Sequence, residues 1–351
     1  MDRQSDKKEV AHPPFPHTDE STVHVPGSQL VKCGIVLHCG PPGSWDAGMV
    51  ESPVVWYDHH RASFGMVYTG YARGGRAERG YASVHRPQIG LAWSEDLVSW
   101  QKDPSSPIFG PSDRVGSPDP TGTAGPFIWQ EEGRYHLFYF GVTEEGYERG
   151  TKTLNLAVSE DLLDWERYGG NPIITPSGDG WRRDAIWHPH VLKVASTYYL
   201  FFNASGTHGG VEEEFIGYAT STDLKQWTVD DTHSPVLVGS MQAETWDSTG
   251  RGGDPSLYRH RDVWYMAYYS WDGIHSQDGI AWTTEEEFPL GWRPIDGNPV
   301  LRVGRPGTHD ALHAAKPHII EHGHRHYHFY TAVDSSEGRE IALAVWPGPC
   351  R

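Results

Sequence analysis

Five short segments of the chain combine carboxylates with tryptophan, arginine, histidine or lysine just before a proline. They end at Pro53, Pro126, Pro189, Pro255 and Pro317. A carboxylic acid and a carboxylate that are held close together can perform general acid–base chemistry. Aromatic rings and charged side chains around such a pair can bind the faces and hydroxyls of a sugar. We therefore expect the five segments to meet at a site that binds carbohydrate.

Carboxylates close to these prolines are the candidates for catalysis. They are Asp46, Glu51, Asp184, Glu244 and Asp254. The candidates for substrate binding are the other polar and aromatic residues of the same segments, namely Trp45, Asp119, Arg183, Trp187, His188, Asp247, Asp310, His313 and Lys316. His188 and Lys316 directly precede their prolines, as Asp254 does, so we expect these three side chains to face the same way.

An aspartate stands seven residues before the proline in three of the segments, at Asp46, Asp119 and Asp310. This repeated offset also fits a structural role, in which each carboxylate caps a loop or holds a neighbouring repeat. The acidic run 212–214 is predicted to be a solvated turn.

The elements that position these segments form a repeat. Two alternating, β-rich strands follow each proline, and a Ser-x-Asp-Leu-x-x-Trp turn and a short final strand follow them. The turn is clear at 92–100, 157–165 and 219–227, looser at 280–292, and incomplete after Ile341. Its aspartate and tryptophan are interpreted as structural. Five copies of four strands predict an all-β fold, a five-bladed β-propeller of four-stranded antiparallel blades.

The fifth copy lacks its last strand. The apolar run Leu30–Leu37 can supply it, which would close the ring with N- and C-terminal strands in one blade. Residues 29–351 are therefore predicted to form a single propeller domain, and residues 1–28, polar and rich in proline, a disordered or extended leader.

Charge and composition restrict the partners. The formal net charge of −17 argues against nucleic acid and anionic membrane as partners, and no segment approaches the roughly 18 apolar residues of a membrane span. No signal peptide is seen, which predicts a cytoplasmic protein, or a secreted one if a signal was removed. With three cysteines, a disulfide between Cys33 and Cys39 is compatible with the sequence but not demanded by it.

The repeat resembles the five-bladed propeller glycoside hydrolases, which comprise the arabinanase/β-xylosidase group and the invertase/levansucrase group. The resemblance covers residues 30 to 348 and implies a site of three carboxylates at one end of the central channel. Asp46 resembles the base or nucleophile, and Arg183-Asp184 resembles the Arg-Asp motif that stabilises the transition state. Asp254 stands where the acid, a glutamate, is expected, with Glu244 and Asp247 as rivals and Glu51 as a further candidate.

The resemblance implies a glycosidase that cleaves an oligo- or polysaccharide. A phosphorylase of the mannoside type is an alternative, because Arg182, Arg183, His188 and Lys316 could bind phosphate. A propeller that binds carbohydrate without catalysis is another. No cofactor is required, and a calcium ion held in the channel by water and one histidine would leave no sequence signature. The sugar, the stereochemistry and the oligomeric state stay open.

Overall fold

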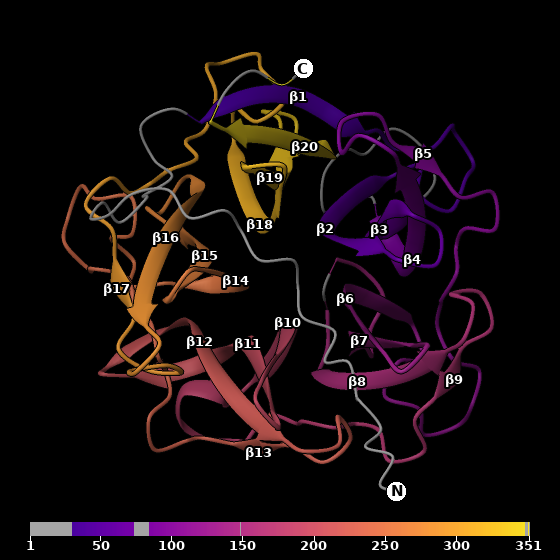
Figure 1. Cartoon of the computed structure of the whole chain (residues 1–351), viewed down its shortest axis with the longest axis horizontal. Helices are drawn as coiled ribbons and strands as arrows, with labels where there is room; N and C mark the ends of the chain where they lie inside the picture. Colours follow the sequence, from indigo (N-terminus) through magenta and orange to yellow (C-terminus); the bar gives the residue numbers. More distant parts are fainter. Residues whose placement is uncertain (1–29, 74–83, 148, 348–349, 351) are drawn as a thin grey trace, which may run out of the picture.

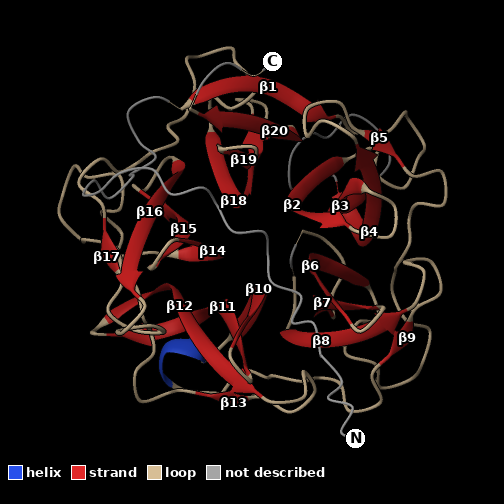
Figure 2. Cartoon of the chain, viewed as in Figure 1, coloured by secondary structure: helices blue, strands red, loops and turns tan. Residues whose placement is uncertain are grey.

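Five antiparallel sheets surround a central axis in the computed structural model, which describes residues 30–73, 84–147, 149–347 and 350 (Figure 1). The five-bladed propeller is thus confirmed, and the expected leader, residues 1–28, lies outside the described residues. Almost all regular structure is strand, and the short 3-10 turn η2 (Gly180–Arg182) is the helical element in Figure 2. None of the described residues belongs to a helix that is long and apolar enough to span a membrane.

Each blade runs from an innermost to an outermost strand in sequence order. Blade 1 contains β2 (Met49–Asp58), β3 (Ser63–Arg73), β4 (Val84–Ser94) and β5 (Gln101–Lys102). Blade 2 contains β6 (Gly122–Glu131), β7 (Arg134–Val142), β8 (Lys152–Ser159) and β9 (Glu166–Arg167). Blade 3 contains β10 (Ala185–Val194), β11 (Thr197–His208), β12 (Val211–Ser221) and β13 (Thr228–Val229). Blade 4 contains β14 (Gly253–His260), β15 (Val263–Trp271), β16 (Ser276–Thr284) and β17 (Arg293–Pro294).

Blade 5 joins the two ends of the chain. It contains β18 (His313–His322), β19 (Arg325–Val333), β20 (Arg339–Trp346) and β1 (Val31–Leu37). The outermost strand β1 pairs antiparallel with β20, from Val31 opposite Val345 to Leu37 opposite Ile341. The predicted closure of the ring by the N-terminal strand is therefore confirmed.

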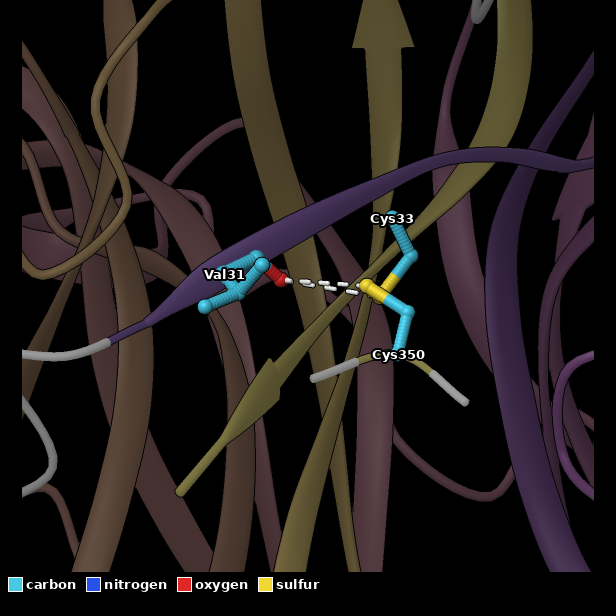
Figure 3. Close-up of a disulfide and its surroundings, with 3 residues drawn as sticks. All are labelled: Val31, Cys33 and Cys350. Carbon is cyan, nitrogen blue, oxygen red and sulfur yellow. Dashed lines mark hydrogen bonds between the residues drawn. A yellow bond between two sulfur atoms is a disulfide. The ribbon is translucent and has the colours of Figure 1, made fainter. Parts of the chain in front are cut away.

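A disulfide adds a covalent link to this closure. Cys33 in β1 is bonded to Cys350, and the sulfur atoms lie close to the carbonyl oxygen of Val31 (Figure 3). The pairing of Cys33 with Cys39 that the sequence allowed is wrong, and Cys39 is a free thiol. The six-residue spacing gave no sign that the distant Cys350 returns to β1, because that approach depends on closure of the whole ring.

The Asp-Leu-x-x-Trp turn behaves as predicted. In blade 2, Asp161 Oδ1 accepts hydrogen bonds from the backbone N–H groups of Leu163 and Asp164, both at 2.9 Å. The Trp165 indole donates to the carbonyl oxygen of Leu162, whose side chain is fully buried. Equivalent contacts fix the turns of blades 1 and 3. These residues therefore hold the turn and have no part in the site.

The innermost strands share a distortion at the entry prolines. The residue before each proline has a positive φ, between 48° and 60°, at Ser52, Gly125, His188, Asp254 and Lys316. The strand register shifts at the same place in all five blades. A bulge of this kind redirects a side chain, and positive φ is uncommon for residues other than glycine. The five residues are thus brought to a common level around the central channel.

Candidate functional site

A cavity of about 350 Å³ lies at the end of the propeller where the innermost strands of blades 3 to 5 begin. Its polar wall contains two carboxylates, Glu214 and Asp254, and three cations, Arg251, Lys316 and Arg339. Its aromatic wall consists of Tyr147, Trp187, Tyr269 and Trp271. Flat rings around a few convergent charged groups are typical of a pocket that orients a small polar ligand such as a sugar.

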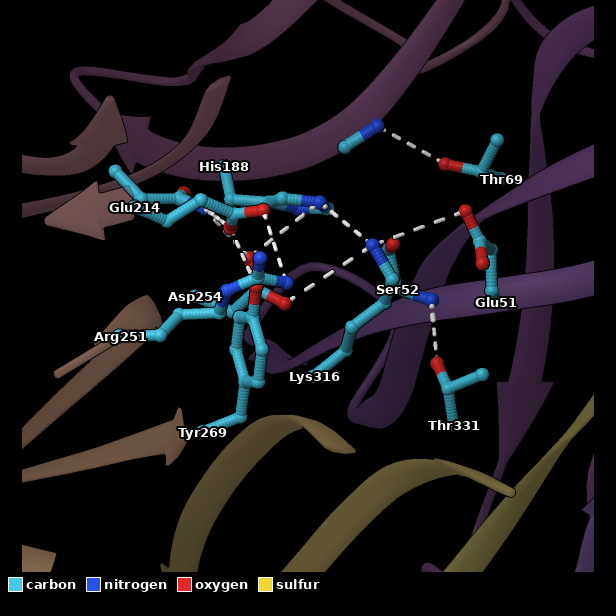
Figure 4. Close-up of polar contacts among 12 residues, drawn as sticks. Glu51, Ser52, Thr69, His188, Glu214, Arg251, Asp254, Tyr269, Lys316 and Thr331 are labelled. Atoms are coloured by element: carbon cyan, nitrogen blue, oxygen red, sulfur yellow. Dashed lines mark hydrogen bonds and ion pairs between the residues drawn. The ribbon is translucent and has the colours of Figure 1, made fainter. Parts of the chain in front are cut away.

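The five residues that directly precede the entry prolines, here called the strained ring, contribute Asp254 and Lys316 to the cavity lining, and His188 contacts both of them (Figure 4). Lys316 Nζ donates to His188 Nε2 at 2.8 Å and lies 4.0 Å from Asp254 Oδ2. His188 Nε2 is 3.5 Å from Asp254 Oδ1. Burial, together with the charges of Lys316 and Lys152, lowers the pKa of His188 well below its usual value. His188 is therefore neutral and can accept the hydrogen bond from Lys316.

One amide joins the two carboxylates of the cavity. Asn203 Nδ2, on β11, donates to Asp254 Oδ1 at 3.1 Å and to Glu214 Oε2 at 3.4 Å. Two oxygens that share a donor nitrogen at these distances can be no more than about 6.5 Å apart. Glu214 also accepts a hydrogen bond from the Tyr269 hydroxyl and lies 3.6 Å from Arg251 Nη1. Asp254 and Glu214 are thus close neighbours that have different partners.

A third carboxylate, Glu51, lies behind the cavity wall. It is 1% exposed, pairs with Arg339, and accepts a hydrogen bond from the Tyr147 hydroxyl at 3.2 Å. Lys316 Nζ is 3.9 Å from its other oxygen. Burial alone would raise the pKa of Glu51, but the charges of Lys316 and Arg339 outweigh it and lower that pKa. Glu51 is therefore ionised and fixes two cations of the cavity wall.

Four of the residues predicted from the sequence line the cavity: Trp187, Asp254, His313 and Lys316. Glu51 and His188 contact these residues or their neighbours from behind. Burial and the nearby His275 lower the pKa of His313 to about 4, so this histidine is neutral at the cavity wall. The strained ring, recognised in the sequence as residues directly before prolines, is the part of the prediction that leads to the cavity.

The three aspartates seven residues before a proline share a different environment. Asp119 accepts hydrogen bonds from Ser117 and from Tyr139 at 3.0 Å, and pairs with Arg167 of the outermost strand at 2.8 Å. A hydroxyl residue, a tyrosine and a cation also surround each of the other two aspartates. At Asp46 they are Ser44, Tyr68 and Lys102. At Asp310 they are Thr308, Tyr330 and Lys32. None of the three lines the cavity. Their contacts join the inner loop to the outer strand of one blade, as a structural role requires.

The remaining candidates also lie outside the cavity lining. Asp184 is 47% exposed and pairs with Arg183, which also contacts Glu212. Glu244 is exposed, and Asp247 accepts hydrogen bonds from Ser240. Trp45 stacks on Tyr68 beside Asp46. The expected group of Asp46, Asp184 and Asp254 is thus distributed over three environments, and only Asp254 faces the cavity.

Sequence reasoning missed several cavity residues, and Glu214 is the most important. The predicted solvated turn at 212–214 is wrong, because these residues continue strand β12 beyond the expected hairpin, opposite Ser205 to Thr207. Glu212, next to the end of the hairpin, is 73% exposed, whereas Glu214, two residues further along the strand, is 19% exposed and lines the cavity. Arg251 precedes β14, Tyr269 and Trp271 lie at the end of β15, and Arg339 begins β20. They were missed because none of them directly precedes an entry proline.

Two further histidines, His190 and His318, line a narrow extension of the channel beneath the ring, together with Asp254 and Lys316. The sequence also allowed a calcium ion that is held in the channel by water and one histidine. That ion stays a prediction.

Comparisons with known proteins agree with the propeller fold. Residues 118–290 match the model described as "Glycosyl hydrolases family 32 N-terminal domain". The chain resembles the propeller glycoside hydrolases. It is 25% identical over 231 residues to a 1,2-beta-oligomannan phosphorylase of Thermoanaerobacter sp. (strain X514), a match that covers 65% of this chain and 66% of that protein's length. The chain is thus similar in sequence to proteins that act on glycosides.

Solved structures support the fold. A structure named "Glycoside hydrolase" is 21% identical with a TM-score of 0.73, over 92% of this chain and 94% of that one. A thermostable family-43 glycoside hydrolase is 16% identical with a TM-score of 0.60, over 88% and 91%.

Proposed function

We propose that the chain is a glycoside hydrolase and that Asp254 and Glu214 are its acid–base pair. The observation that supports this is the shared contact of both carboxylates with Asn203 on the floor of a cavity lined by aromatic rings. Cleavage of a glycosidic bond needs one protonated carboxyl to donate to the leaving oxygen and one ionised carboxylate to attack or to activate water. Substrate would enter from the open end, with its sugar ring against Trp187, Trp271 and Tyr269.

The charges around the cavity favour water over phosphate as the acceptor. Arg339 lies against Glu51, Arg251 against Glu213 and Glu214, and Lys316 between Glu51 and Asp254. Each cation is thus already compensated by at least one carboxylate. A phosphate dianion would be repelled by the same carboxylates, whereas an uncharged sugar and water would not.

Phosphorolysis is the second candidate. Three cations and two neutral histidines surround one cavity, and the similar protein from Thermoanaerobacter is a phosphorylase. A phosphorylase would use a single acid and would tolerate loss of one of the two carboxylates better than a hydrolase would.

The test is turnover of aryl glycosides and of mannose- and arabinose-based disaccharides, with and without inorganic phosphate. We expect release of free sugar without phosphate, and a loss of kcat of about 100-fold or more in both Asp254→Asn and Glu214→Gln. Asp184→Asn is the matched control, since its exposed carboxylate lies outside the cavity. Strict dependence on phosphate would support the phosphorylase instead. Unchanged turnover in Asp254→Asn would reject the assignment of the site.

A further inference from the structure

Three side chains with metal-binding atoms gather at the other end of the propeller: His260, Glu321 and His326. His260 ends β14, Glu321 is near the end of β18, and His326 is near the start of β19. Strands β14 and β18 begin at the cavity and run away from it. His260 stands six positions after Asp254 in β14, a distance of about 20 Å along the strand. The cluster is therefore separate from the proposed active site.

The spacing of the three groups suits a tetrahedral ion. His260 Nδ1 lies 3.3 Å from Glu321 Oε2, and the ligand atoms of all three residues lie within 4.8 Å of one another. Nitrogen and oxygen ligands bind zinc at about 2.0–2.2 Å, which places neighbouring ligand atoms about 3.4 Å apart in a tetrahedron. Only small side-chain rotations are needed to reach this arrangement.

The backbone holds these ligands in place. Glu321 and His326 are direct partners in the β18–β19 ladder, and His260 comes from the adjacent blade. The His326 ring is buried and lies 5.3 Å from the Tyr258 ring and 5.4 Å from the Trp346 ring, measured between centroids. Ligands on rigid strands lose little freedom when they bind an ion, which favours affinity.

The Tyr258 hydroxyl can donate a hydrogen bond to a water molecule that is bound to the ion. Tyr258 Oη is buried and has no hydrogen-bond partner among the residues that the structure describes. Three protein ligands and one water complete a four-coordinate shell.

We propose that His260, Glu321 and His326 form a zinc site that joins blade 4 to blade 5. Two imidazoles and one carboxylate suit Zn²⁺, whereas Ca²⁺ and Mg²⁺ prefer shells of oxygen atoms. Because its ligands come from two blades, the ion stabilises the contact between them. The site is independent of the chemistry in the cavity.

The test uses the full chain without a histidine tag, freed of metal by a chelator that is then removed. Titration with Zn²⁺, followed by calorimetry and by elemental analysis after gel filtration, is expected to give one equivalent per chain and a higher Tm. Glu321→Gln, which keeps the shape of the side chain, and His260→Gln are expected to weaken binding about 100-fold or more and to abolish the rise in Tm.

His324→Asn is the matched control. His324 is an exposed histidine in the turn between the same two strands, with a φ of 65° that asparagine tolerates. The His324→Asn variant should bind zinc as tightly as the unmodified chain does. No bound zinc in the unmodified chain, or equal affinity in Glu321→Gln, would overturn the proposal.

Discussion

At the scale of single residues, charge compensation governs the wall of the cavity. Glu51 is almost fully buried, yet it stays ionised because Arg339 and Lys316 lie against it. A buried charge that loses its partner is costly, so the three side chains depend on one another. The positions of Arg339 and Lys316, which line the cavity, thus depend on Glu51, which does not line it.

Replacement of Glu51 by glutamine is expected to lower the free energy of unfolding at pH 7 by about 3–5 kcal/mol, because two buried cations lose their partner. The folded-state pKa of Glu51 lies below its ordinary value of 4.5. The stabilisation is therefore complete above that value and is lost as the pH falls through the folded-state pKa. Urea unfolding of both proteins from pH 7 to pH 3 should show the difference shrinking at acid pH.

Glu212→Gln is the control for this measurement. Glu212 also pairs with an arginine but is 73% exposed, so its loss should change the free energy of unfolding by less than about 1 kcal/mol at any pH. Equal effects of the two substitutions would contradict the account of Glu51.

At the scale of the blade, the contacts around Asp46, Asp119 and Asp310 explain how an inner loop stays attached to an outer strand. We call each of these three groups an aspartate clip. Each clip contains a hydroxyl residue, a tyrosine and a cation around one buried carboxylate. Burial and the aspartate charge raise the pKa of the tyrosines, which therefore remain hydrogen-bond donors to the carboxylate. Because the clip lies inside one blade, its loss should affect stability and leave catalysis intact.

Asp119→Asn is expected to reduce the free energy of unfolding by about 3–5 kcal/mol, since Arg167 and Tyr139 lose a buried anionic partner. The kcat of the folded protein should stay within about twofold of the original value. Urea unfolding and initial rates measure the two effects separately. Glu160→Gln, which breaks the exposed pair with Arg134 in the same blade, should change neither. A large loss of kcat in Asp119→Asn would show that the clip belongs to the active site.

The blade was predictable because its signals are local. The proline, the alternating strands and the Asp-Leu-x-x-Trp turn all lie within one repeat, and the structure has each of them in place. The cavity depends on contacts between repeats. Asp254 and Lys316 were found from their register before a proline, but Glu214 depends on how far β12 continues beyond the hairpin. The seven-residue offset of Asp46, Asp119 and Asp310 likewise identified a repeated role. Only the contacts of these aspartates with other strands of the same blade reveal what that role is.

At the scale of the whole molecule, the ring is closed twice, by the β1–β20 ladder and by the Cys33–Cys350 disulfide. The two cysteines are 317 residues apart in the chain. Cross-linking such distant residues restricts the unfolded chain strongly, which favours the folded state. A disulfide is typical of proteins in oxidising compartments, and both predicted locations, cytoplasmic and secreted, stay predictions.

Cys350→Ser is expected to lower the free energy of unfolding by up to about 5 kcal/mol under oxidising conditions. A reducing agent should lower the stability of the unmodified chain to that of the variant. Cys39→Ala is the control, because Cys39 takes no part in the disulfide. Burial raises the pKa of its thiol to about 11, so the thiol stays protonated. Guanidinium unfolding with and without reductant measures all three. No difference between Cys350→Ser and the unmodified chain would contradict the role of the disulfide.

The joined ends have a consequence for how the protein survives damage. With Cys33 bonded to Cys350, nearly the whole backbone is one covalent loop. A single proteolytic cut in any surface turn between these residues opens the loop but releases no fragment, because the two pieces remain attached through sulfur. The blades on both sides of the cut can stay in place around the axis, so a nicked molecule could keep its cavity until the disulfide is reduced.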